Sequence, residues 1–411
     1  MQGEYLIKAN PIRIIPFDLG RTLTERDICE IQLHATKHGS IKELTNRQAS
    51  ILKRCVLAYC INEHVLIYLY KNGIAVVVID EEIIEISDEY ETFSIPYDEN
   101  RKQAHTALFN WEHKYSALIK KTICELKRIV ALNMTKKQKL RISCRDDFEN
   151  SGLSYIMTLS LFDIPKESLT PNGFKNYPKW LQNNIHALLD PSLLYLEDSS
   201  KFSVASDSVF DPKKLLSSLD IENVPFDYER HKNISTYMSW AAVVVIGQLL
   251  DTDKEEYVSL EVQLQCDWFY VYCIEKNMPV ESKINKNDII YSQRQSYELD
   301  LLENRLFDFD DSSMPARVLD IQKGLIETSG LANNIQHLQR KIRYLLERAQ
   351  METEIKQKRI GQSTEILLFV IAYIEVAPVI AEYGNNIFPF GGIIANILLL
   401  ITGIFLLCCS K

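Results

Sequence analysis

Two carboxylates interrupt the most apolar part of the chain. Glu375 and Glu382 lie within residues 366–410, which contain no Lys or Arg and no other Asp or Glu. A charged side chain at membrane depth costs about 2.5–3.5 kcal/mol on insertion scales, so it usually faces protein or water. Residues seven apart share one face of a helix. A single membrane helix cannot shield this face. A ring of copies could turn it toward a water-filled axis, where carboxylates attract cations.

The same two carboxylates also have a structural interpretation. Glu375 could hydrogen-bond a neighbouring helix, and this alternative stays open beside the pore-lining one. Glu382 precedes Tyr383 and the connecting loop directly. This position favours the outer membrane interface for Glu382.

Two asparagine amides follow the carboxylates, in the stretch Tyr383-Gly384-Asn385-Asn386. Amide oxygens can contact the water shell of an ion without the cost of a buried unpaired charge. Asn386 comes eleven residues after Glu375, which is about three helical turns or 16 Å. The spacing predicts a neutral amide ring at a pore mouth and a carboxylate ring deeper in, if symmetric copies surround one axis.

Two apolar helices must position these residues. As helices, residues 366–383 would cover about 27 Å and residues 387–409 about 35 Å, which predicts two membrane spans joined by a tight turn. Lys and Arg stand just before the first span and Lys411 follows the second, whereas the turn has neither. The positive-inside rule then predicts a multi-pass protein of the inner (plasma) membrane with both termini in the cytoplasm.

A long helix is expected to lead into the first span. Between Pro315 and Tyr383 we expect the glycines to weaken the helix without ending it, so the pattern predicts one helix about 100 Å long, with residues 315–365 as a stalk. Its apolar residues step by three and four, as in a coiled-coil seam. The seam consists of Ile335, Leu338, Ile342, Leu345 and Ala349.

Residues 1–312 have the pattern of a cytosolic α/β domain. Residues 4–17 are predicted to form an edge or opening strand, whose pairing Pro11 and Pro16 limit. Asn72-Gly73 predicts a type I′ hairpin turn between two apolar runs. Further strands are expected at 154–164 and 237–247, helices at 24–39, 41–60, 103–134 and 254–277, and loops with short helices over 165–232.

The C-terminal hundred residues resemble the CorA family of divalent-cation channels. The resemblance rests on the order of α/β domain, stalk, span, short loop and span, and on Tyr383-Gly384-Asn385-Asn386, which is similar to the family's Tyr-Gly-Met-Asn. It implies a CorA-like fold and a homo-oligomer of five copies. It also implies that Asn386 contacts the hydrated ion at the outer mouth and that Gly384 makes the close turn. Asn385 replaces the family's Met, so selectivity for Mg²⁺ does not follow.

Divergent CorA-like proteins also occur as membrane effectors of type III CRISPR antiviral systems, controlled by a nucleotide second messenger. The resemblance therefore implies a non-enzymatic cation channel gated by a cytosolic sensor domain, with a small nucleotide as a possible ligand. The alternatives are a housekeeping transporter of Mg²⁺ or another divalent cation, and a non-conducting membrane-anchored signalling or scaffold protein. An enzyme is disfavoured because P-loop, HExxH and GxSxG motifs are absent from the sequence.

Other candidate ligands are weaker. Asp308, Asp310 and Asp311 offer oxygen atoms that suit Mg²⁺ or Ca²⁺, although a solvated acidic cap at the start of the stalk is the favoured interpretation. Cys29, His34 and His38 lie close in sequence, but free thiols in a reducing cytosol are the simpler interpretation. The net charge of −9 argues against broad nucleic-acid binding.

Overall fold

The computed structural model describes residues 6–87, 115–135, 140–141, 157–164, 177–189, 234–239, 242–279, 286–307, 315–387 and 390–409. The chain divides into two compact units. The first contains residues 1–278 and 297–339, and the second contains residues 279–296 and 340–411.

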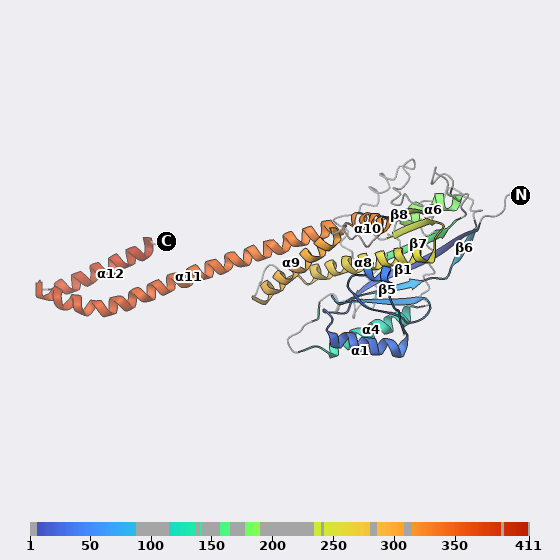
Figure 1. Ribbon diagram of the computed structural model, residues 1–411. Helices are drawn as coiled ribbons and strands as arrows, with labels where there is room; N and C mark the ends of the chain where they lie inside the picture. Colours follow the sequence, from blue (N-terminus) through green and yellow to red (C-terminus); the bar gives the residue numbers. More distant parts are fainter. Residues whose placement is uncertain are drawn as a thin grey trace. The chain divides into compact units, whose positions relative to one another are not determined.

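The described elements are drawn in Figure 1. The strands are β1 (Leu6–Asp18), β2 (Ser40–Ile41), β3 (Cys55–Cys60), β4 (Val65–Tyr70), β5 (Ile74–Asp80), β6 (Ile84–Ser87), β7 (Met157–Asp163), β8 (Ile234–Met238) and β9 (Ala242–Gly247). The helices are α1 (Glu25–His38), α2 (Asn46–Ile51), α4 (Ser116–Leu132), α6 (Lys179–Leu189), α8 (Asp251–Lys276), α9 (Lys286–Phe307), α10 (Ala316–Ser329), α11 (Leu331–Ile387) and α12 (Gly391–Cys409).

The strands form one mixed sheet in the order β2-β3-β4-β5-β1-β7-β9-β8, with β6 also paired to β1. Only the β7–β9 pair is parallel among the described pairs. Strand β1 opens the fold but is central in the sheet, so the edge alternative is wrong. Pro16 lies beyond Ile14, the last residue that pairs with β7, and Pro11 lies where the neighbouring strand changes from β5 to β6. Each proline therefore pairs with a neighbouring strand on one side only.

Helices cover both faces of this sheet. Alternate residues of β1 point to one face, where Ile15 and Phe17 pack in a cluster with α1 and α4, and Ile7 and Ala9 pack with α6. Helix α8 packs on β1 and β5 from the opposite side (Figure 1). Every residue of β5 except Asp80 is buried, as expected for a strand covered on both faces. The predicted α/β region is therefore confirmed.

Helix α1 matches its prediction, whereas the predicted second helix is mostly wrong. The Thr24 side chain caps α1 in a capping box with Asp27, and the helix stops at Gly39. Of residues 41–60, only α2 is helical, and the rest includes strand β3, which pairs with β4. Alternate β3 residues Leu57 and Tyr59 enter the sheet core, so tertiary packing overrides the helical pattern.

The predicted hairpin is confirmed, but its turn is of another type. Strands β4 and β5 pair in antiparallel register. The Gly73 N–H donates to Tyr70 O at 2.9 Å and Gly73 is left-handed at φ 86°, whereas Asn72 is not left-handed. This is a type I turn followed by a left-handed glycine rather than a type I′ turn.

Three other predicted elements differ in extent. Residues 237–247 form the end of β8 and all of β9, two antiparallel strands instead of one. Helix α4 lies inside the predicted helix 103–134, whose start is outside the described residues. In the predicted loop region 165–232, the structure describes residues 177–189, which include α6.

The single helix predicted from 315 to 383 is interrupted. Helix α10 ends at Ser329, and Gly330 adopts a left-handed conformation at φ 65° before α11 begins. Helix α11 nevertheless has 57 residues with Pro378 inside it, which corresponds to about 85 Å. The predicted seam is buried within one chain: Ile335, Leu338, Ile342, Leu345 and Ala349.

Helix α8 carries an ionisable side chain in the core. Glu261 is fully buried, and neither of its carboxyl oxygens has a hydrogen bond of normal geometry in the described part of the chain. Burial raises the pKa of Glu261 to about 8, and the Gln265 amide one turn later offsets this only in part. The native state therefore favours the neutral acid.

This burial predicts a pH-dependent stability. The native pKa lies above the ordinary value of 4.5, so the folded state holds the proton more tightly and stability falls as pH rises from about 4.5 to 8. Glu261→Gln should be more stable than wild type near pH 8, by on the order of a few kcal/mol, and similar near pH 4.5. Denaturant unfolding at both pH values measures this. Glu255→Gln, on a partly exposed residue of α8, is the control, and an equal pH response of wild type and Glu261→Gln would contradict the account.

Candidate functional site

The C-terminal part of α11 is apolar and uncovered. Among the described residues, α11 is the one helix long and apolar enough to cross a membrane, and none of its apolar window is buried inside the chain. Ile366, Leu367 and Ile374 each expose more than half of their surface. Such a continuous apolar surface needs lipid or another protein to cover it. Helix α12 is a shorter apolar helix.

Helices α11 and α12 are held together at close range. An added Cβ on Gly392 would lie 2.5 Å from Ala381 O and 2.7 Å from Ala381 Cα, so only glycine permits this approach. The Asn396 Nδ2 donates to Ala377 O at 3.1 Å. Left-handed Phe390 accepts from the Ile393 N–H and so starts α12. The two apolar helices therefore pack against each other and are joined by a short connection, as the sequence predicted.

Asn396 was not singled out by the sequence analysis. A lone amide within an uncharged apolar helix was the signal that could have found it. Its Oδ1 is buried and has no hydrogen-bond partner within the described chain. The Nδ2 donates both to Ala377 O on α11 and to Gly392 O on α12, so this side chain ties the two helices together.

Glu375 is exposed and lies away from α12. At about 100° per residue, Glu375 stands on the opposite side of α11 from Ala377 and Ala381, which face α12. Glu382, seven residues later, is exposed on the same side as Glu375. Helix α12 therefore covers neither carboxylate.

The first apolar helix ends later, and the second begins later, than the sequence predicted. Gly384, Asn385 and Asn386 continue α11, which ends at Ile387, and α12 starts at Gly391 rather than at Ile387. Tyr383 is an exposed residue inside the helix. Glycine and asparagine weaken a helix without ending it, whereas the proline at 389 disfavours helix in the residue before it. One unbroken helix therefore connects Glu375 to Asn386.

The three candidate aspartate ligands cannot be compared with the structure. Asp308, Asp310 and Asp311 lie outside the described residues. Within the described ranges no group of three His, Cys, Asp or Glu side chains could hold a metal ion. His34 lies 2.9 Å from the Glu125 carboxylate, and this contact lowers the pKa of Glu125.

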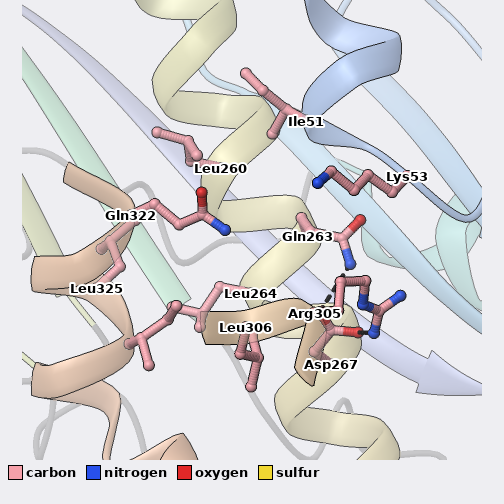
Figure 2. A pocket seen from close by; sticks show the side chains of 11 residues that line it. Ile51, Lys53, Leu260, Gln263, Leu264, Asp267, Arg305, Leu306, Gln322 and Leu325 are labelled. Atoms are coloured by element: carbon pink, nitrogen blue, oxygen red, sulfur yellow. Dashed lines mark hydrogen bonds and ion pairs between the residues drawn. The ribbon is translucent and has the colours of Figure 1, made fainter. Parts of the chain in front are cut away.

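The first unit contains a small cavity that the sequence analysis missed. It lies between α2, α8, α9 and α10 and has a volume of about 30 Å³ (Figure 2). Its polar lining residues are Lys53, Gln263, Asp267, Arg305 and Gln322, and leucine and isoleucine side chains form the remainder. An aspartate within the apolar run of α8 was a signal in the sequence.

Asp267 and Arg305 form a buried ion pair beside this cavity. Arg305 Nη2 lies 3.0 Å from Asp267 Oδ1, and Gln263 Nε2 donates to Asp267 Oδ2 at 2.8 Å (Figure 2). Burial raises the pKa of Asp267, and the positive charges of Arg305 and Arg54 oppose this rise. The pair joins α8 to α9.

Further polar contacts join these helices to the start of α11. Gln339 of α11 donates to Asp300 and Glu303 of α9, both at 2.8 Å. Arg317 of α10 pairs with Asp253 at 2.7 Å and Glu256 at 2.9 Å, both on α8. The cavity is thus surrounded by helices that are linked by charged and polar side chains.

Comparison with known proteins gives no relative. No protein-family model, curated protein or solved structure matches the chain. The functional interpretation therefore rests on the geometry of this chain.

The close approach at Gly392 predicts a steric effect. Gly392→Ala should force α12 away from α11 and lower the thermal midpoint of the detergent-solubilised protein, at a cost of about 1–3 kcal/mol. Gly361→Ala is the matched control, because an added Cβ there meets nothing within 4 Å. Equal midpoints for the two variants would show that the hairpin does not pack through Gly392.

Proposed function

We propose that this chain is a subunit of a homo-oligomeric, CorA-like cation channel of the inner (plasma) membrane, opened by its N-terminal α/β domain. One observation carries the proposal. Glu375 is exposed within the apolar part of α11, on the side that α12 leaves open. The first residues of the same helix belong to the folded N-terminal unit.

The carboxylate accounts for ion preference. Lipid contact at Glu375 would cost about 2.5–3.5 kcal/mol per chain, and a water-filled axis between copies removes this cost. A ring of carboxylates concentrates cations and repels anions. Asn386, three turns further along the helix, would add a neutral amide ring at the mouth. Two membrane crossings, by α11 and α12, place both termini in the cytoplasm in this proposal.

A second side of α11, which also carries Arg348, exposes large apolar residues that support assembly from several copies. Tyr344, Met351 and Ile355 are exposed large apolar residues, spaced so that they share one side of the helix. The buried seam residues, such as Ile342, lie on the other side. Since one face is already covered within the chain, the exposed face is available to a neighbouring copy.

Opening requires a ligand that binds the open and closed states differently. We propose a ligand-triggered role, as in antiviral effectors, over housekeeping transport of Mg²⁺, because Asn385 replaces the methionine of the family motif. The alternative is a non-conducting anchored scaffold, and the absence of ion flux in liposomes would indicate it.

The proposed carboxylate ring predicts a change in ion preference. In planar bilayers with asymmetric salt, Glu375→Gln should shift the reversal potential toward zero, because it removes the negative ring without changing side-chain volume. Glu365→Gln, ahead of the apolar segment, is the control and should leave the potential unchanged. An unshifted potential in Glu375→Gln would make Glu375 a packing residue.

The exposed stripe predicts an assembly defect. Ile355→Asp should lower the oligomer mass in detergent, because it places a charge in the contact between copies. Gln357→Asp introduces the same charge on the other side of α11 and should leave the mass unchanged. Light scattering measures both. A monomeric wild type, or an intact Ile355→Asp oligomer, would refute assembly through this face.

A further inference from the structure

Basic side chains line the cavity in the first unit although the whole protein has a net charge of −9. Lys53 and Arg305 line it, and Asp267 is the carboxylate among its described lining residues. The positive charge of Arg54 also acts on Asp267. Lys53 and Arg305 can therefore attract a negatively charged group to the cavity.

Arg305 has hydrogen-bonding capacity that the chain does not use. Its side chain exposes only 15% of its surface, and Nη2 is taken by Asp267. The Nε and Nη1 atoms are buried and find no acceptor in the described part of the chain. Buried guanidinium nitrogens without acceptors are costly, and an oxyanion beside one of them would supply an acceptor.

We propose that this cavity binds a compact oxyanion, a phosphate or carboxylate group, through Arg305 and Lys53. The volume of about 30 Å³ is room for roughly two water-sized groups, which suits such a group but not a whole nucleotide. The amides of Gln263 and Gln322, which also line the cavity, can orient the bound oxygens. The anion can bind while Arg305 Nη2 keeps its pair with Asp267.

Anion binding at this cavity could affect the contact between α9 and the start of α11. Arg305 lies on α9, and Asp300 and Glu303 of the same helix accept hydrogen bonds from Gln339 of α11. An anion that draws Arg305 toward the cavity would act on the helix that holds the start of α11. This consequence rests on the proposed channel function, whereas binding itself does not.

Calorimetry on the full-length protein in detergent tests the site, with inorganic phosphate and acetate as separate probes. Wild type should bind at least one of them in the roughly millimolar range expected for a few charge-assisted hydrogen bonds. Tighter binding of phosphate identifies a phosphate site, and tighter binding of acetate a carboxylate site. Wild-type protein that binds neither would overturn the proposal.

Variants locate the binding. Arg305→Gln should weaken the affinity for the bound probe at least about tenfold, and Lys53→Gln several-fold, because each removes a cation from the cavity. Arg26→Gln, on the exposed face of α1, is the matched control and should keep wild-type affinity. Lys53 is on the surface and its variant should fold, so the affinity of Lys53→Gln tests the site even if Arg305→Gln is unstable. Equal affinity of Lys53→Gln and Arg26→Gln would overturn the site.

Ion flux in liposomes separates this proposal from the channel. If the probe binds in the Arg305-dependent manner and flux does not respond, the site stands and its coupling to a channel fails. If the protein conducts but neither probe binds, the channel stands and the anion site fails.

Discussion

The cost of placing a carboxylate at membrane depth is the constraint on which the proposed channel depends. Glu375 sits in the apolar, uncovered stretch of α11, and α12 packs against the other side of that helix. Among the described residues, those of α12 that face α11 therefore offer Glu375 no polar partner. In the proposed channel, self-association around a water-filled axis removes this cost and lets the carboxylate attract cations.

Helix α11 serves two environments along its length. Its first turns have a buried seam and are tied to α9 by Gln339. Its last turns expose apolar side chains and carry Glu375. In the proposed channel, the continuous helix α11 would carry a movement at α9 toward the apolar segment. Gly330 separates α10 from α11 and marks a place where the helix direction can change.

The sequence predicted elements well where local chemistry decides the outcome. The Thr24 cap, the β4–β5 hairpin and the apolar α11 all follow from residue types and spacing. It failed where tertiary contacts decide. The residues of β3 have a helical pattern, and the pairing with β4 that makes them a strand is not visible in the sequence. The proline-containing strand β1 can be central because each proline lies where a neighbouring strand ends on one side. Among the site residues, Glu375 was visible as a charge in an apolar run, and Asp267 stood out only as an acid within α8. The pairing of Asp267 with Arg305 was not visible, because 38 residues separate the two and only the packing of α9 on α8 joins them.

The most direct test of the central claim is whether water reaches position 375. In a variant with its native cysteines replaced by serine, Glu375→Cys and Val376→Cys would be treated in liposomes with a membrane-impermeant thiol reagent, which reacts with the thiolate formed in water. A water-filled axis predicts rapid modification at 375 and protection at 376, about 100° around the helix. Equal protection of both positions would contradict a pore lined by Glu375.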